Sequence, residues 1–157
     1  MFVRSVAVAA VVLLLNSATA LSSDNGIAGL VLEVYKTPTC GCCGKWVDHL
    51  RDHGFEVKVN EVSNTRAVQD RAGVPRELRS CHTAIVGEYF VEGHTPADVI
   101  EQFFTEQPEG VRGIGVPGMP MGSPGMESPN PEVYDIIAVG EDGSLSRYAT
   151  RQGKAPE

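Results

Sequence analysis

Alternating hydrophobic and polar positions predict two strands in the first part of the folded chain. Residues Leu30–Lys36 (LVLEVYK) and Phe55–Val62 (FEVKVNEV) alternate in this way and are rich in branched side chains. The segment between them, Gly44–His53, has its apolar residues at helical spacing, and Gly54 then supplies a residue type that commonly ends helices. The core face of this predicted helix carries Trp46, Val47 and Leu50. The pattern therefore predicts a strand–helix–strand unit.

Shorter elements follow in the middle of the chain. A short helix is expected over Thr65–Ala72, because a glycine closes the segment. The apolar runs Thr83–Val86 and Tyr89–Val91 are separated by Gly-Glu and are expected to form a hairpin. Thr95 is expected to cap a helix that has a proline at its first position and runs to about Glu106.

The C-terminal part of the chain changes character. Residues Gly110–Pro131 are rich in glycine and proline and show no periodicity, so we expect a loop there. Tyr134–Val139 and Leu145–Ala149 are then expected to pair as strands across a Glu-Asp-Gly turn. Because regular elements lie on both sides of it, the loop is expected to be a tethered flap.

The order of the predicted elements indicates an α/β fold of the thioredoxin-like type. Strand–helix alternation followed by a hairpin and a helix favours a central mixed sheet flanked by helices. The C-terminal Gly/Pro/Met loop and β-hairpin would then extend this domain. The cysteine cluster supports the prediction, because it lies between the first strand and the first helix, where that fold carries its active CxxC motif.

The N-terminus has the features of a cleaved signal peptide. Arg4 precedes the apolar run Val6–Leu15, and Ala18–Ala20 (ATA) matches a signal-peptidase site. We therefore expect residues 1–20 to be removed and residues 21–157 to form a single periplasmic domain. The alternative is an uncleaved N-terminal anchor. No later segment is apolar enough to predict a membrane anchor in the mature chain.

The charge balance excludes one class of partner. The chain has 13 basic and 20 acidic residues, with a net charge of −7. It shows no basic stripe, so we expect no nucleic-acid partner.

The four cysteines carry the most specific chemical signal. Cys40, Cys42 and Cys43 fall within four consecutive positions, and Cys81 stands alone. Exported proteins usually pair their cysteines in disulfides, but this spacing does not suit two such bridges. Either the Cys40/Cys43 pair cycles as a redox disulfide, or a bound metal protects the thiols. Buried, unreactive cysteines are the remaining alternative.

The predicted fold brings the cysteines together. Thiols at a helix N-terminus have lowered pKa values, which favours the thiolate that attacks disulfides and binds metals. Cys81 and His82 lie directly before the predicted strand Thr83–Val86, where thioredoxin-like proteins usually have a cis-proline. We therefore expect four thiols, with the His82 imidazole, to converge. Cys81 as a small core residue is the alternative.

Methionines indicate which metal this site prefers. Four thiolates suit Zn²⁺ or another thiophilic metal, whereas thiolates with thioethers suit Cu(I). Met119 and Met121 lie in the predicted flap, where they could close over the site as ligands. Their alternative role is packing of the loop. His49 and His53 have metal-pair spacing, but no carboxylate or cysteine nearby in sequence completes a site, so a solvated helix face is the preferred interpretation.

Several motifs together resemble a known family, the CopG-like exported metal-binding proteins, formerly described only as a domain of unknown function. The matching segments are Val34–Cys43 (VYKTPTCGCC) with Trp46, Ser80–Ala84 (SCHTA), Gly93–Pro96 (GHTP), Gly115–Pro120 (GVPGMP) and Gly125–Glu127 (GME). The resemblance covers residues 30–149. It implies a thioredoxin-like fold, copper binding through the CxCC motif and the distal cysteine, and a role in copper resistance. It also implies several Cu(I) ions bridged by thiolates.

These arguments predict a periplasmic copper-handling protein. The expected metal ligands are Cys40, Cys42, Cys43, Cys81, His82, Met119 and Met121. Copper ions, and possible exchange with other periplasmic copper-handling proteins, are the expected partners. Interconversion of Cu(I) and Cu(II) is a further hypothesis. The rival functions are a thiol–disulfide oxidoreductase that uses Cys40 and Cys43, and an electron carrier with an iron–sulfur cluster.

Overall fold

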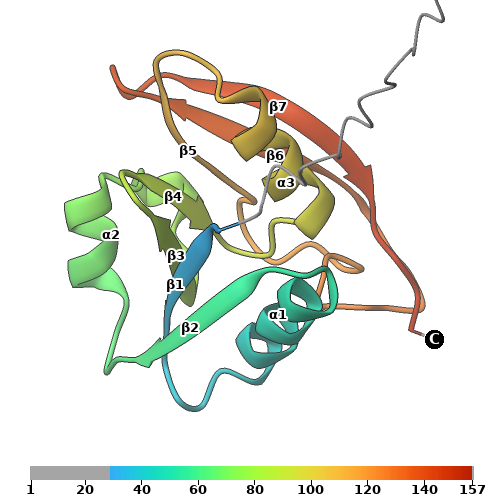
Figure 1. Cartoon of the computed structure of the whole chain (residues 1–157). Coiled ribbons are helices and arrows are strands. Elements are labelled where there is room, and N and C mark those ends of the chain that lie inside the picture. Colours follow the sequence, from blue (N-terminus) through green and yellow to red (C-terminus); the bar gives the residue numbers. More distant parts are fainter. Residues whose placement is uncertain (1–28, 157) are drawn as a thin grey trace, which may run out of the picture.

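A computed structural model describes residues 29–156 of the chain, which form one seven-stranded mixed sheet with three α-helices (Figure 1). The expected signal peptide, and the alternative N-terminal anchor, lie outside the described residues. Within residues 29–156, no helix has the length and apolar character needed to cross a membrane.

The strands and helices alternate at first and end in a group of strands. In chain order they are β1 (Val31–Lys36), α1 (Gly41–Asp52), β2 (Glu56–Glu61), α2 (Arg66–Ala72), the short 3₁₀ helix η1 (Arg76–Leu78), β3 (His82–Val86), β4 (Tyr89–Glu92), α3 (Ala97–Glu106), β5 (Val111–Gly115), β6 (Val133–Gly140) and β7 (Leu145–Gln152).

The sheet has the strand order β2-β1-β3-β4-β5-β6-β7. β1 pairs with β2 in parallel, and β4 pairs with β5 in parallel. The remaining neighbours are antiparallel. The expected mixed sheet is therefore confirmed, and the C-terminal hairpin β6–β7 continues the same sheet through β5.

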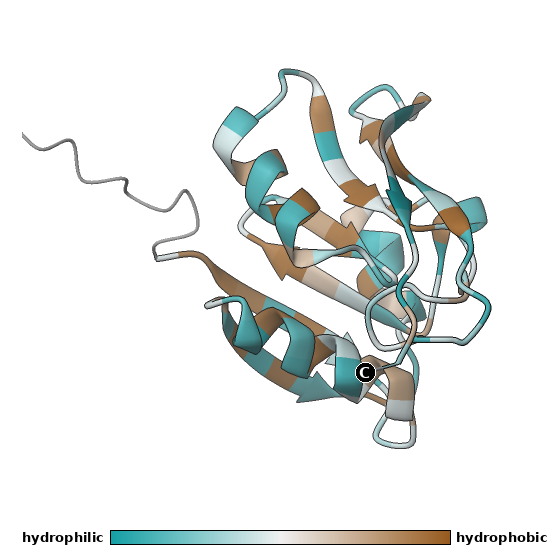
Figure 2. Ribbon diagram, turned by 90° about the vertical axis from the view of Figure 1, so that its right-hand side faces the viewer, coloured by the Kyte–Doolittle hydropathy of each residue, from teal (hydrophilic) through white to brown (hydrophobic). Residues whose placement is uncertain are grey.

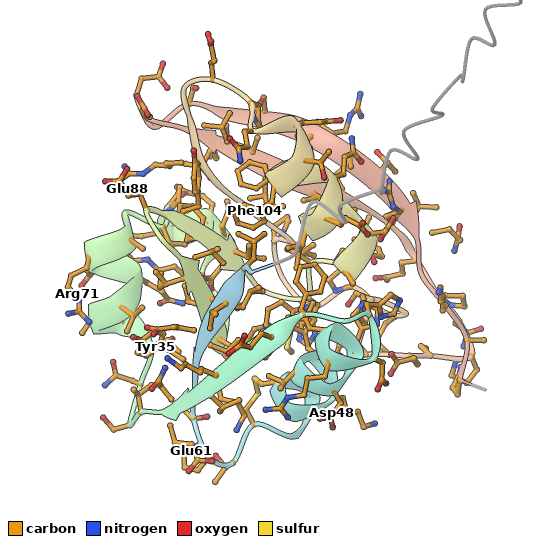
Figure 3. All side chains as sticks on the ribbon, in the orientation of Figure 1. Tyr35, Asp48, Glu61, Arg71, Glu88 and Phe104 are labelled. Carbon is orange, nitrogen blue, oxygen red and sulfur yellow. A yellow bond between two sulfur atoms is a disulfide. The ribbon has the colours of Figure 1, made fainter. Side chains whose placement is uncertain are left out.

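Both faces of the sheet are covered, because successive residues of a strand point to opposite sides. On β4, Val91 joins the larger core with α1 and α3, whereas its neighbour Phe90 joins a smaller core with Val74 and Leu78 after α2. Hydrophobic and hydrophilic residues alternate along the strands and the helices, so each element has a hydrophilic side (Figure 2). Asp48 and Arg71 lie on the outer sides of α1 and α2, and Phe104 lies between α3 and the sheet (Figure 3).

Most of the predicted elements are present within a residue or two of their expected limits. The expected core face of α1 is confirmed, since Trp46, Val47 and Leu50 are all buried. However, α1 begins at Gly41 and not at Gly44. Gly41 and Gly44 made the first turn look non-helical in the sequence. The first turn tolerates these glycines, because its N–H groups make few hydrogen bonds within the helix. Cys42 and Cys43 are thus inside the first turn.

The start of α3 differs from the prediction in its cap. Thr95 does not cap the helix, because its hydroxyl donates to the backbone oxygen of Glu92 at 2.9 Å. Pro96 occupies the N-cap position without a side-chain cap bond. Thr95 therefore fastens the end of β4 and not the start of α3.

The prediction of an unbroken loop over residues 110–131 was wrong at its start. β5 occupies Val111–Gly115 and lies inside the sheet, between β4 and β6. Its glycines permit close approach to β4: a Cβ on Gly113 would lie 2.6 Å from the backbone oxygen of Phe90, and one on Gly115 would lie 2.9 Å from Cβ of Glu92. Here glycine marks a tightly packed strand, although in sequence it resembles a turn signal.

Candidate metal centre

The end of β1 and the start of β3 lie side by side at one edge of the sheet, and the cysteines lie there. In the antiparallel β1–β3 pair, Lys36 at the end of β1 faces His82 at the start of β3. Cys40 follows β1 by four residues as the N-cap of α1, and Cys81 immediately precedes β3. The register of two strands therefore brings together thiols that are 41 positions apart in sequence.

The four sulfur atoms form a compact group, all lying within 4.8 Å of one another. Cys81 is central to it: its Sγ lies 3.2 Å from Sγ of Cys40 and 3.1 Å from Sγ of Cys43. Sγ of Cys42 lies 3.6 Å from Sγ of Cys40. Cys43 is fully buried, and the other three are partly exposed. The expected convergence of Cys40, Cys42, Cys43 and Cys81 is present in the structure.

Cys40 and Cys43 are joined by a disulfide, while Cys42 and Cys81 are free thiols. Because the two disulfide sulfurs carry no hydrogen, the Cys81 thiol is the group able to donate in its contacts with them. The structure thus shows the oxidised form of the cluster. In this form two of the four expected ligands must first be reduced before they can bind a metal as thiolates.

The environment of Cys81 favours the protonated thiol. Burial raises its pKa to about 11, and the neighbouring Cys42 adds to the effect. Cys81 directly precedes β3 and does not lie at a helix N-terminus. A metal ion would supply the positive charge needed to hold Cys81 as a thiolate.

His82 lies directly beneath the thiols and is fully buried. Its Nε2 lies 2.9 Å from the backbone oxygen of Gly93, and its Nδ1 lies 3.8 Å from Sγ of Cys81. The Trp46 ring packs against it with centroids 4.4 Å apart. Burial lowers the pKa of His82 to about 3, so the imidazole is neutral and has a lone pair facing Cys81.

His94 also belongs to this edge, although the sequence analysis did not include it among the expected ligands. It follows the end of β4, which pairs with the start of β3. Its ligand atom lies within 4.8 Å of those of Cys81 and His82, and its ring meets the His82 ring edge-on at 4.9 Å. The hairpin register was the signal, because it returns the chain to the position of Cys81.

A buried carboxylate fixes the segment that carries Cys81. One oxygen of Glu92 accepts hydrogen bonds from the backbone N–H and the hydroxyl of Ser80, at 2.6 and 2.9 Å, and from Gln69 at 2.9 Å. Its other oxygen accepts from Thr83. Burial outweighs these bonds and raises the pKa of Glu92 to about 7. Glu92 therefore anchors the residues on both sides of Cys81 and His82.

The glycine- and proline-rich segment after β5 covers the start of α1. A Cβ on Gly125 would lie 2.7 Å from the backbone oxygen of Cys42, so this loop rests on the first turn of the helix. Pro124 accepts a hydrogen bond from Nδ1 of His94 at 2.8 Å. The loop also bonds to the end of the chain, through Lys154 N–H to Gly122 O at 2.7 Å.

The two predicted thioether ligands lie on the outer part of this loop. The side chains of Met119 and Met121 are 55% and 43% exposed. Their role as metal ligands stays a prediction, since the contact with the cysteine-bearing helix is made by Gly125.

His49 and His53 are neighbours, with ring centroids 4.3 Å apart, but His49 has a structural role. Its Nε2 accepts a hydrogen bond from the N–H of Ala97 at 3.1 Å, at the start of α3. Burial lowers the pKa of His49 to about 4. The interpretation of this pair as a purely solvated face was therefore wrong for His49, which joins α1 to α3.

The donors at this edge suit a thiophilic transition metal. The grouped atoms are sulfur and neutral imidazole nitrogen, the ligand types that copper and zinc accept. The buried Nε2 of His94, for which the described residues supply no hydrogen-bond partner, fits a metal ligand better than a structural histidine.

Comparison with known proteins supports the same conclusion. The family described as "Protein of unknown function, DUF411" matches residues 78–126, which include Cys81, His82 and His94. No curated protein sequence matches the chain. Two solved structures, titled "Copper resistance protein copG- Form 2" and "Form 1", match with 37% and 38% sequence identity. Both have a TM-score of 0.73, and the alignments cover 78% and 79% of this chain and 98% of each structure.

Proposed function

Because this chain belongs to the family of the CopG copper resistance proteins, we propose that it binds copper in the periplasm and serves in copper resistance. The observation that carries the proposal is the group of four cysteine sulfurs within 4.8 Å of one another. Copper is the metal named in the titles of the matched structures, and thiolates are ligands that prefer Cu(I).

The proposed mode of binding is a cluster of Cu(I) ions bridged by thiolates. Three cysteines within four residues crowd more sulfur around one point than a single tetrahedral ion needs. Cys81 supports bridging, because its sulfur already lies close to those of Cys40 and Cys43. Met119 and Met121 are proposed to add thioether ligands when copper is bound.

Loading of this site requires reduction of the Cys40–Cys43 disulfide. Two electrons and two protons from a dithiol reductant give two thiols, and binding of Cu(I) then releases the thiol protons. Copper enters as the cargo of the site. A thioredoxin-like framework, supported by the order β2-β1-β3-β4 with its parallel β1–β2 pair, would keep this disulfide accessible to reductants. Interconversion of Cu(I) and Cu(II) at the cluster is part of the proposal.

Anaerobic titration tests the proposal. The protein is reduced with dithiothreitol, freed of reductant and titrated with Cu(I) against a chromophoric chelator. More than one copper per chain is expected for the parent, with a loss of at least one on Cys81→Ser. Cyclic voltammetry of the loaded protein tests the redox part. Binding of no copper by the reduced parent would refute the proposal.

A thiol–disulfide oxidoreductase remains the second candidate, because the structure holds the Cys40–Cys43 disulfide. In that case the reduced protein should reduce insulin disulfides, and the activity should need Cys40 and Cys43 but survive Cys81→Ser. A copper-binding protein shows the opposite pattern, in which Cys81→Ser has the large effect. The same variant therefore separates the two functions.

A further inference from the structure

We propose that the cavity where α1, the start of α3 and the hairpin β6–β7 meet binds a small zwitterion of the amino-acid type with an apolar side chain. The cavity has a volume of about 220 Å³. None of the expected metal ligands lines it, so the inference does not depend on the copper function.

The wall of this cavity is rich in rings. They belong to His49 and His53 on α1, Pro96 at the start of α3, Pro124 in the loop after β5, and Tyr134 on β6. Burial lowers the pKa of His49 to about 4, so this ring is neutral at pH 7. A cavity of about 150 Å³ holds benzene, so this one has room for about nine non-hydrogen atoms, as many as leucine has.

The Tyr134 hydroxyl is an unused donor at this cavity. Tyr134 is only 8% exposed, and its hydroxyl makes no hydrogen bond within residues 29–156. Burial, together with the nearby Asp98, raises the pKa of Tyr134 to about 12, so the hydroxyl stays protonated and able to donate. A buried tyrosine hydroxyl usually has a hydrogen-bond partner, and a ligand carboxylate in the cavity would accept from this one.

Charged groups of both signs stand around the rings. Arg151 and Asp98 form an ion pair at 2.8 Å, whereas Lys154 forms no ion pair within residues 29–156. Glu127 accepts a backbone N–H of the loop with one carboxylate oxygen at 2.7 Å, which leaves the other oxygen available. Lys154 and Glu127 act on the pKa of His49 in opposite directions, so both lie near this ring.

This arrangement favours a ligand that carries both charges. The charged side chains of the wall balance, since two are cationic and two are acidic. Lys154 and the Tyr134 hydroxyl can bind a carboxylate, and Glu127 can bind an ammonium group, while an apolar side chain packs among the rings. A lone carboxylate or a lone amine would leave one of these groups without a partner, so the zwitterion should bind most tightly.

The ligand would also contact the loop that covers the start of α1. Gly122 and Pro124 of this loop line the cavity, and Gly122 O accepts the backbone N–H of Lys154 at 2.7 Å. An occupied cavity therefore adds contacts that hold the loop against the domain.

Isothermal titration calorimetry of the full mature chain, oxidised and free of metal, tests the inference with three matched probes. They are leucine, 4-methylpentanoate, which lacks the ammonium group, and 3-methylbutylamine, which lacks the carboxylate. We expect leucine to bind saturably with a Kd of about 1 mM or below, and at least about tenfold more tightly than either analogue.

Two variants test the groups assigned to the carboxylate. Tyr134→Phe removes only the hydroxyl and should weaken leucine binding about three- to tenfold. Lys154→Gln removes the positive charge and should weaken it about tenfold or more. The matched controls are Tyr148→Phe and Lys58→Gln, because Tyr148 and Lys58 contact other carboxylates outside the cavity. Both controls should bind leucine as the parent does.

Three results would overturn the inference. They are the absence of saturable leucine binding by the parent up to about 10 mM, equal affinity for leucine and either analogue, and unchanged leucine affinity in a folded Tyr134→Phe or Lys154→Gln protein. Urea unfolding shows whether the variants fold, and if they do not, the ranking of the three probes by the parent decides. Copper titration is a separate measurement, so the failure of either proposal leaves the other intact.

Discussion

Replacement of Gly125 by alanine is expected to lift the loop from the first turn of α1. Gly125 has φ of +84°, and its added Cβ would lie 2.7 Å from Cys42 O and 2.9 Å from Trp46 N. Both atoms belong to the backbone of the helix, so neither can swing aside as a flexible side chain could. Gly118→Ala is the matched control, since Gly118 has φ of +71° and nothing within 4 Å of its Cβ position.

Gly125→Ala and Gly118→Ala share the free-energy cost of a left-handed backbone, but only Gly125→Ala adds a steric cost. A left-handed backbone costs an alanine roughly 1–2 kcal/mol, of which the lower entropy of the unfolded chain recovers about 0.4–1 kcal/mol. Gly118→Ala should therefore lose between about 0 and 1.6 kcal/mol. Gly125→Ala adds a steric overlap, and overpacking typically costs about 1–3 kcal/mol more. The difference between the two variants isolates the contact of the loop with α1.

Urea unfolding of the oxidised proteins measures this difference, and the rate at which the free thiols of Cys42 and Cys81 react with Ellman's reagent reports on the loop. We expect Gly125→Ala to be the less stable variant and its thiols to react several-fold faster. Equal stability together with equal thiol reactivity in the two variants would refute the argument that the loop covers the cysteine cluster.

Three other substitutions test the surroundings of the centre by urea unfolding. His49 has a folded-state pKa of about 4, below its usual 6.5, so its contribution to the free energy of unfolding is complete above pH 6.5 and is lost as the pH falls toward 4. After allowance for solvent screening this contribution is about 1–2 kcal/mol. His49→Gln should therefore flatten the dependence of stability on pH between 6.5 and 4. Glu92 affects stability in the opposite direction, because its pKa is raised from 4.5 to about 7. About 3 kcal/mol of the free energy of unfolding is therefore lost as the pH rises through 7. If the stability of Glu92→Gln depended on pH as steeply as that of the parent, this reasoning would be contradicted. Trp46→Phe leaves the buried backbone oxygen of Thr95 without its 2.8 Å donor, and a loss of about 1–3 kcal/mol is expected; a change below about 0.5 kcal/mol would show that this bond is dispensable.

Local pattern was sufficient to predict six of the seven strands, and their order then predicted the convergence of the cysteines. β1 and β2 alternate clearly and β3 and β4 are short apolar runs, and the position of Cys81 before β3 needed only the pairing of β3 with β1. β5 could not be predicted in this way, because Gly113 and Gly115 read as turn residues until the closeness of β4 is known. Which ring nitrogen of a histidine is left to bind a metal depends on partners that are distant in sequence. His94 therefore became recognisable as a candidate ligand only once the structure placed Pro124 beside its Nδ1.

The disulfide between Cys40 and Cys43 was one of two alternatives that the spacing left open, and the structure contains it. The sequence could not decide between them, because the same four cysteines serve either chemistry. The oxidation state of a thiol depends on the reductants around it as well as on the fold.

The bond between Lys154 and Gly122 joins the covering loop to the last residues of the chain, and Gly153 and Glu132 form a second such bond at 2.8 Å. The cysteine-rich turn lies early in the sequence, whereas the loop that covers it is held by Gly153 and Lys154. A chain made from its N-terminus would therefore contain all four cysteines before Gly153 and Lys154 can hold the loop in place. The cover of the cysteine cluster therefore depends on contacts between segments that lie far apart in the sequence.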